Sequence, residues 1–271
     1  MADSKLKIDI RRDRILELLR QSGKVQVSEL SKELGATPVT IRNDLDSLER
    51  DGYLVRIQGG ALLRARSVDS WNGPDQEMVC QAEKRAIARA VAAQIPDGST
   101  LFINSGTTTH CIAEELKECR NINVVTNSLA VAMELGKQPL IHVLLLGGEI
   151  NAQYGFTYGT DAEAQLHRYQ AGWAILSVDG VSARGGVTSF HAEETPIDRM
   201  MIERSKHIII AADHTKINRT GFTRICDIGP EVSLLADQNG TSTAVKLVTD
   251  QQCSRDAVAE LEALGMEVEL A

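Results

Sequence analysis

Beyond about residue 96, short apolar runs alternate with stretches in which apolar residues recur every three or four positions. The short runs have the length of buried strands: Leu101–Ile103, Ile122–Val125, Ile141–Leu146, Trp173–Val178, His207–Ala211, Val245–Val248 and Met266–Leu270. The helical stretches between them are Thr108–Leu116, Leu129–Leu135, Asp161–Arg168, Glu194–Lys206 and Ser254–Leu264. This alternation predicts an α/β domain with a mostly parallel sheet.

The first part of the chain has a different pattern. Helical spacing predicts three short helices: Arg11–Gln21, Val27–Leu34, and one from Thr37-Pro38 to about Asp51. The third begins with a polar cap followed by proline at the first helical position. Tyr53–Leu63 then predicts two strands around the turn Gln58-Gly59-Gly60. Three helices followed by a hairpin predict a small winged helix-turn-helix domain.

In that geometry the third helix enters the DNA major groove and the hairpin lies along the backbone. Polar side chains off the buried face are candidates for base contact, and hairpin side chains are candidates for backbone contact. For any one position, an ordinary solvated surface is the favoured alternative. The candidate DNA-binding residues are Thr37, Thr40, Arg42, Asn43, Arg56 and Gln58.

Periodicity fails after residue 63, where Ser, Asn, Gly and Pro accumulate. We therefore expect a DNA-binding domain at 1–66, a linker at 67–76 and an α/β domain at 77–271, which opens with a helix over Glu77–Ile95. Residues 1–66 carry 13 Lys and Arg against 10 Asp and Glu, a net charge of +3; the remainder carries 16 against 27, a net charge of −11. The basic N-terminal domain can contact DNA even though the remainder of the chain is acidic.

Composition excludes several classes of protein. The five cysteines are odd in number and lack C-x-x-C spacing, which disfavours a disulfide framework or a zinc site. The six histidines show no metal-ligand spacing, so no metal or other cofactor is expected. The sequence shows neither a membrane-length apolar run nor a signal-peptide core, and we expect a cytoplasmic protein.

The stretch Thr100–Leu116 combines a strand, a small polar loop and a helix. Its loop residues are Asn104, Ser105, Gly106, Thr107, Thr108 and Thr109. A helix N-terminus with free backbone N–H groups favours an anion, above all a phosphate. Ligands bind beyond the carboxyl ends of strands in such sheets, and small or polar residues follow the other predicted strands too. An ordinary Ser/Thr-capped turn remains the alternative for this stretch alone.

Two stretches resemble a known family. TPVTIRNDLDSLERDGYLVRIQGGA is similar to the DNA-binding segment of the DeoR family of bacterial transcriptional regulators. NSGTTT, TNS, GG, DG…GGVT and ADHTK resemble its sensor domain in order and spacing. The resemblance implies a sensor fold like that of ribose-5-phosphate isomerase and the CoA transferases, which binds a phosphorylated sugar or related metabolite.

The expected ligand site joins the phosphate loop to residues after the other strands. We expect Ser105–Thr109 to hold the phosphate and Lys216, which matches a phosphate-binding lysine, to neutralise it. Sugar hydroxyls would be bound by Asn127, Asp179 and Glu194, with Gly147 and Gly148 also lining the site. Asp213 either orients Lys216 or forms a structural salt bridge.

The fold kinship leaves one rival, an active phosphosugar isomerase fused to a DNA-binding head. The isomerase family has a motif similar to Asp-Gly-Ala-Asp, followed by Lys-Gly-Gly-Gly and then by a catalytic Glu. The matching stretch here begins at Asp179, but it has Ser182 in place of the second Asp and Arg184 in place of the Lys. Glu193 or Glu194 lies near the position that corresponds to the catalytic Glu. Because isomerisation needs a base and an acid, we interpret the domain as a binder without catalytic residues.

The resemblance implies a transcriptional regulator that represses a carbohydrate-utilisation operon, with its binding to operator DNA controlled by an effector. A phosphorylated sugar is the expected effector. Helix-turn-helix proteins read DNA as dimers, so we expect a homodimer or tetramer.

Overall fold

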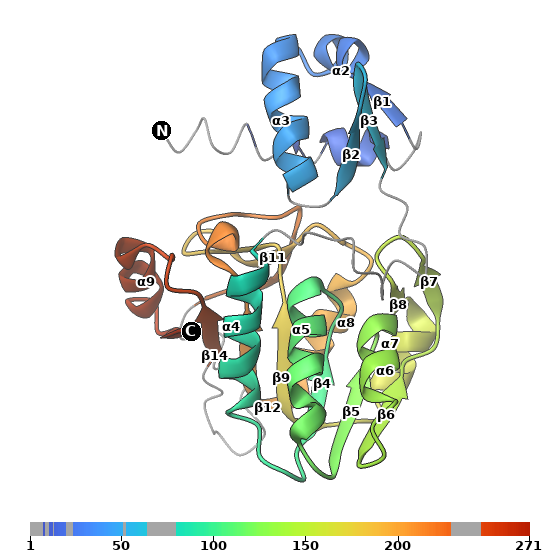
Figure 1. Cartoon of the computed structure of the whole chain (residues 1–271), viewed down its shortest axis with the longest axis vertical. Coiled ribbons are helices and arrows are strands. Elements are labelled where there is room, and N and C mark those ends of the chain that lie inside the picture. The colour runs from blue at the N-terminus through green and yellow to red at the C-terminus, as the bar shows by residue number, and fades with distance from the viewer. Residues whose placement is uncertain are drawn as a thin grey trace. The chain divides into compact units, whose positions relative to one another are not determined.

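The computed structural model describes residues 8, 11–12, 14–19, 24–50, 53–63, 80–228 and 245–271. Contacts divide the chain into two units, Met1–Val79 and Cys80–Ala271 (Figure 1). The predicted linker at 67–76 lies outside the described residues, as do 77–79 of the helix expected from Glu77.

The N-terminal unit contains the expected helices and hairpin. Residues 11–12 and 14–19 are helical, and they are followed by α2 (Val27–Glu33), α3 (Pro38–Arg50), β2 (Leu54–Ile57) and β3 (Gly60–Leu63). The strand β1 (Lys24–Gln26), which pairs antiparallel with β3, was not predicted. Three residues are too few to show the alternation of a strand. Gly60 permits this pairing, since a Cβ there would lie 2.0 Å from the Val25 carbonyl oxygen.

The apolar stripes of these helices form one core. Its fully buried residues are Ile15, Leu19, Ile41, Leu45, Leu48 and Leu54. Asp44 lies on α3, as do Ile41 and Leu45 of this core, and it is only 2% exposed. The guanidinium groups of Arg11 and Arg12 lie 2.5 and 3.2 Å from its carboxylate and compensate its charge.

The second unit is built on a seven-stranded sheet with the order β15-β14-β12-β9-β4-β5-β6. All six pairings are parallel. In chain order the strands are β4 (Thr100–Ile103), β5 (Ile122–Thr126), β6 (Ile141–Leu145), β9 (Ala171–Ser177), β12 (Ser205–Ala211), β14 (Val245–Thr249) and β15 (Glu267–Leu270). The predicted α/β class and mostly parallel sheet are confirmed.

Helices cover both faces of this sheet (Figure 1). The helices α4 (Gln81–Ala92), α5 (Thr107–Glu115) and α6 (Leu129–Leu135) pack in sequence on one side. The helices α7 (Thr160–Leu166), α8 (Thr195–Glu203) and α9 (Arg255–Glu262) share a core cluster with strand residues such as Phe102, Leu176 and Ile210. Because successive strand residues point to opposite faces, each strand serves both layers.

Small antiparallel pieces that sequence periodicity missed stand beside the main sheet. One is the hairpin of β7 (Glu149–Asn151) and β8 (Phe156–Tyr158). The other contains β10 (Gly180–Ser182), β11 (Gly186–Ser189) and β13 (Thr223–Cys226). Short 3-10 turns occur at η2 (Leu116–Glu118) and η3 (His214–Lys216).

The predicted helix Glu194–Lys206 was too long. It ends at Glu203 because β12 begins at Ser205, two residues before the predicted strand. The helix expected to run to Ile95 ends at Ala92. Among the described helices, none is both long and apolar enough to cross a membrane.

Candidate functional site

The loop between β4 and α5 has a geometry that only glycine satisfies at Gly106. Its φ is 150°, and an added Cβ would lie 2.7 Å from both the Cβ and the hydroxyl oxygen of Ser177. Glycine therefore lets the chain turn tightly between β4 and α5, in close contact with Ser177 of β9.

Only part of the predicted phosphate loop faces solvent. Gly106 is exposed and Ser105 and Thr107 are half-buried, whereas Thr108 and Thr109 are buried. The Thr109 hydroxyl donates to the Gly106 carbonyl at 3.1 Å. Thr108 and Thr109 thus belong to the packed side of α5, whereas Ser105, Gly106 and Thr107 form the accessible part of the turn.

Asn104 is a bridge within the protein rather than an exposed group. Its amide nitrogen donates to the Ser177 carbonyl at 3.0 Å and to the Asp198 carboxylate at 2.9 Å. Its amide oxygen accepts from Ser177 N at 2.8 Å. These bonds join β4, β9 and α8, so the direct ligand contact predicted for Asn104 has no free donor to supply it.

Glu194 organises the loop from beneath. It is 3% exposed, and Oε1 accepts from the Ser105 hydroxyl at 2.6 Å, Ser105 N at 3.3 Å and the Asn127 amide at 2.8 Å. Burial raises the pKa of Glu194 to about 7, although these donors oppose the shift. Burial, then the charge of Glu194, raises the pKa of Asp198 well above its usual value.

Asn127 is fully buried beside Glu194. Its amide nitrogen also approaches the Thr157 carbonyl at 3.4 Å, while its Oδ1 atom has no hydrogen-bond partner among the described residues. A buried amide oxygen without a donor is costly. Asn127 therefore holds an unused acceptor at the carboxyl end of β5.

Asp179 and Lys216 form the polar pair at the ends of β9 and β12. The Lys216 ammonium lies 3.8 Å from Asp179 Oδ1, and both side chains are 17% exposed. Asp179 Oδ2 accepts from Phe190 N at 2.9 Å. The strands β4, β9 and β12 are neighbours in the sheet, so these groups share the edge at which Ser105 lies.

The Gly147-Gly148 segment contributes backbone only. Gly147 N donates to the Gln165 side chain at 3.0 Å, which fixes the segment against α7. In the following hairpin, the Asn151 amide donates to Glu193 at 2.9 Å. Glu193 was predicted from the sequence only as a possible counterpart of a catalytic glutamate, so this contact was not expected.

Lys84 is the cation that sequence analysis missed. It is 7% exposed, and its ammonium donates to Asp213 Oδ2 at 2.9 Å. Of the two alternatives for Asp213, the structure thus shows a salt bridge, made with Lys84. The signal was present, since Lys84, Ile87, Ala88 and Val91 form the buried stripe of α4. A lysine on an apolar stripe predicts a buried partner.

The candidate DNA-binding residues divide into two groups. Thr37, Arg42, Asn43 and Gln58 are exposed, and Thr37 caps α3 by accepting from Thr40 N at 3.2 Å. Arg56 is held within the protein. Its guanidinium lies 3.1 Å from Asp46 and donates to the Gly60 carbonyl at 3.3 Å.

Comparison with known proteins identifies the family. The profile of the DeoR-like helix-turn-helix domain matches residues 11–66, and that of the DeoR C terminal sensor domain matches residues 79–238. The chain belongs to the DeoR family. It is 33% identical to the glycerol-3-phosphate regulon repressor of Escherichia coli K12 over 241 residues, 89% of this chain and 95% of that protein. It is 32% identical to a putative aga operon transcriptional repressor of Escherichia coli O157:H7, covering 95% of this chain and 92% of that protein.

Solved structures give partial overlaps. Ribose 5-phosphate isomerase from Plasmodium falciparum overlaps with a TM-score of 0.37 at 12% identity, covering 54% of this chain and 53% of that one. A probable sor operon regulator from Shigella flexneri has a TM-score of 0.38 at 9% identity, covering 70% of this chain and 89% of that one. The assignment depends on the sequence relatives, which are named as repressors. This DeoR-family chain is a DNA-binding transcriptional regulator and not an isomerase.

Proposed function

We propose that this DeoR-family regulator represses a carbohydrate-utilisation operon and that a phosphorylated sugar bound in the C-terminal unit controls its affinity for operator DNA. The supporting observation is the accessible Ser105-Gly106-Thr107 turn at the N-terminus of the nine-residue helix α5. Lys216 and Asp179 follow neighbouring strands at the same sheet edge. A small phosphorylated effector also agrees with the name of one relative, the glycerol-3-phosphate regulon repressor.

In this proposal the turn binds the phosphate and Lys216 neutralises it. Backbone N–H groups at a helix N-terminus suit an anion, and a lysine supplies the compensating charge. Asp179, which is half-buried, accepts from sugar hydroxyls. The backbone of Gly147 and Gly148 lines the adjoining side.

Five predicted ligand residues take supporting roles instead. Asn104 and Glu194 hold the turn in place through the bonds described above, and Thr108 and Thr109 anchor the first turn of α5. Asn127 supports Glu194 and offers Oδ1 to a hydroxyl only when the loop opens. Removing any of these would weaken binding by releasing the turn.

On the DNA side, Arg42 and Asn43 of α3 are proposed to contact base edges, and Thr37 and Thr40 the phosphate backbone. Gln58 contacts the backbone from the hairpin, and Arg56 holds the hairpin against α3. A homodimer or tetramer presents two such units to the two half-sites of an operator.

Titration calorimetry of the full chain tests the effector. We expect sugar phosphates to bind and their unphosphorylated parents to bind at least tenfold more weakly. Thr107→Glu should abolish binding, because its carboxylate repels the phosphate. Thr160→Glu is the matched control, since Thr160 is the exposed first residue of α7. If no sugar phosphate binds, or both variants behave alike, the proposed site is wrong.

A further inference from the structure

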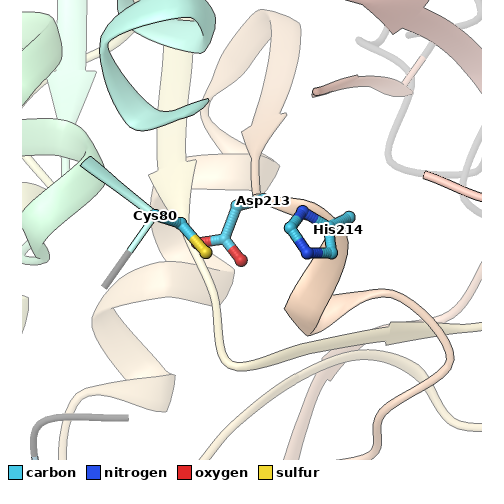
Figure 2. A group of neighbouring side chains, drawn as sticks. All are labelled: Cys80, Asp213 and His214. Atoms are coloured by element: carbon cyan, nitrogen blue, oxygen red, sulfur yellow. The ribbon is translucent and has the colours of Figure 1, made fainter. Parts of the chain in front are cut away.

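A second group of side chains converges where α4 begins and β12 ends. The Cys80 thiol, the Asp213 carboxylate and the His214 imidazole each offer one ligand atom, and these atoms lie within 4.8 Å of one another (Figure 2). Asp213 is 1% exposed, while Cys80 and His214 are half-buried. Cys80 lies at the N-cap of α4, and Asp213 and His214 follow β12 in the chain.

A buried carboxylate orients the histidine. Asp250, 3% exposed at the end of β14, accepts from His214 N at 2.7 Å and lies 3.0 Å from His214 Nδ1. When Nδ1 donates its proton to Asp250, the lone pair of the neutral ring lies on Nε2. Metal-binding histidines are oriented in this way by a carboxylate on the other ring nitrogen.

We propose that Cys80, Asp213 and His214 bind a divalent transition-metal ion of the zinc class, with Asp250 as the positioning residue. Thiolate, imidazole and carboxylate are together the ligand types of zinc, whereas magnesium and calcium prefer oxygen alone. Ligand atoms around a tetrahedral zinc ion lie about 3.5 Å apart, so the side chains must close by about 1 Å. The thiol proton leaves to solvent as the sulfur binds. The fourth position is open to water.

Lys84 is the competitor for this site. Its ammonium donates to Asp213 Oδ2, while the Thr215 backbone N–H, at 3.1 Å, and the Thr215 hydroxyl both donate to Oδ1. A carboxylate has about four lone-pair sites, so a metal ion can share it, but the lysine charge repels the ion. Cys80 and His214 are therefore the stronger anchors, and the affinity is lower than that of a structural zinc site.

The site would control where the chain enters the C-terminal unit. The C-terminal unit begins at Cys80, and a metal ion would tie this residue to the ends of β12 and, through Asp250, of β14. Metal occupancy would thus fix the start of α4, independently of the ligand turn at Ser105–Thr107.

Cobalt titration of the chelator-treated full chain tests the site. We expect one Co²⁺ per chain, a thiolate-to-cobalt charge-transfer band, and displacement of cobalt by zinc. Cys80→Ser should remove the band, and Asp250→Asn should weaken binding about 10- to 100-fold. Cys119→Ser is the matched control, since Cys119 is also half-buried and should leave the band unchanged.

Lys84→Met supplies the distinguishing variant. It should bind cobalt more tightly than the parent chain because the competing ammonium is gone, and its thermal midpoint should rise with added zinc. A folded parent chain with no thiolate band overturns the proposal. A band that survives Cys80→Ser, or that is lost equally in Cys119→Ser, overturns it as well.

Discussion

At the scale of single residues, buried charge is the distinctive feature of the C-terminal unit. Glu194 and Asp198 lie one helical turn apart and are at most 3% exposed. Asp179 adds a third negative charge that raises the pKa of both. The described donors to Glu194 and Asp198 are neutral, namely Ser105, Asn127 and Asn104. Binding of a proton therefore neutralises the buried negative charge at the lowest cost in free energy.

This arrangement predicts that stability falls as pH rises. The pKa of Glu194 is raised from 4.5 to about 7, so the folded state binds a proton more tightly than the unfolded state. The proton on Glu194 therefore contributes on the order of 3 kcal/mol to the free energy of unfolding. This contribution is complete below pH 4.5 and is lost as pH rises through about 7. Urea unfolding at pH 5 and pH 8 should show the parent chain losing stability relative to Glu194→Gln. An equal difference at both pH values would contradict this.

The buried ion pair between Lys84 and Asp213 leads to a second prediction about stability. Lys84→Met leaves the Asp213 carboxylate buried with only the Thr215 donors, at a cost of about 3–5 kcal/mol in metal-free buffer. Adding Asp213→Leu removes the stranded charge and should recover most of that loss. Denaturant midpoints of the single and double variants measure the difference. A double variant as unstable as the single one would show that packing of the lysine stem, rather than charge, is responsible.

At the scale of elements, the turn between β4 and α5 decides what the site can hold. Gly106→Ala must both adopt φ 150° and approach Ser177, so we expect a loss of about 2–3 kcal/mol and weaker effector binding. Gly98→Ala is the matched control, because Gly98 has φ 79° with nothing within 4 Å of an added Cβ. It should cost about 1 kcal/mol and leave binding intact. Unfolding and calorimetry together check both variants.

The exposed face of α3 is the corresponding element in the N-terminal unit. Arg42→Ala should weaken specific operator binding by about 1–3 kcal/mol if the guanidinium contacts a base. Lys32 is an exposed cation in the last turn of α2, and Lys32→Ala is the control. This variant should reduce specific and non-specific DNA binding alike. Competition binding with operator and random duplexes measures both. Equal losses on the two duplexes for Arg42→Ala would assign it to the phosphate backbone.

At the scale of the whole molecule, charge is unevenly distributed along the chain: residues 1–66 carry a net charge of +3 and residues 67–271 a net charge of −11. Removing residues 1–66 should abolish operator binding and leave sugar-phosphate affinity within about twofold, because the ligand turn and its supports lie in the second unit. Retained operator binding would contradict the division of roles. Gel shift and calorimetry on the same truncated chain decide it.

The sequence by itself determined the local elements and the family. Apolar periodicity placed the parallel strands and most helices within a few residues, because burial of one face is written into residue spacing. The order of a strand, a loop that contains Gly106 and a helix also located the turn at Ser105–Thr109. The three-residue strands β1, β7, β8 and β10 were missed because they are too short to show a period.

Only the tertiary structure decided which polar residues are available. Asn104, Thr108 and Thr109 face inward, Asp213 pairs with Lys84 from 129 positions away, and Cys80 meets His214. Spacing along the chain cannot encode these contacts, because each joins segments that are neighbours only after the parallel sheet forms. The residue types fixed the chemistry that the chain can perform, and the packing of strands β4, β9 and β12 fixed which of them remains free to perform it.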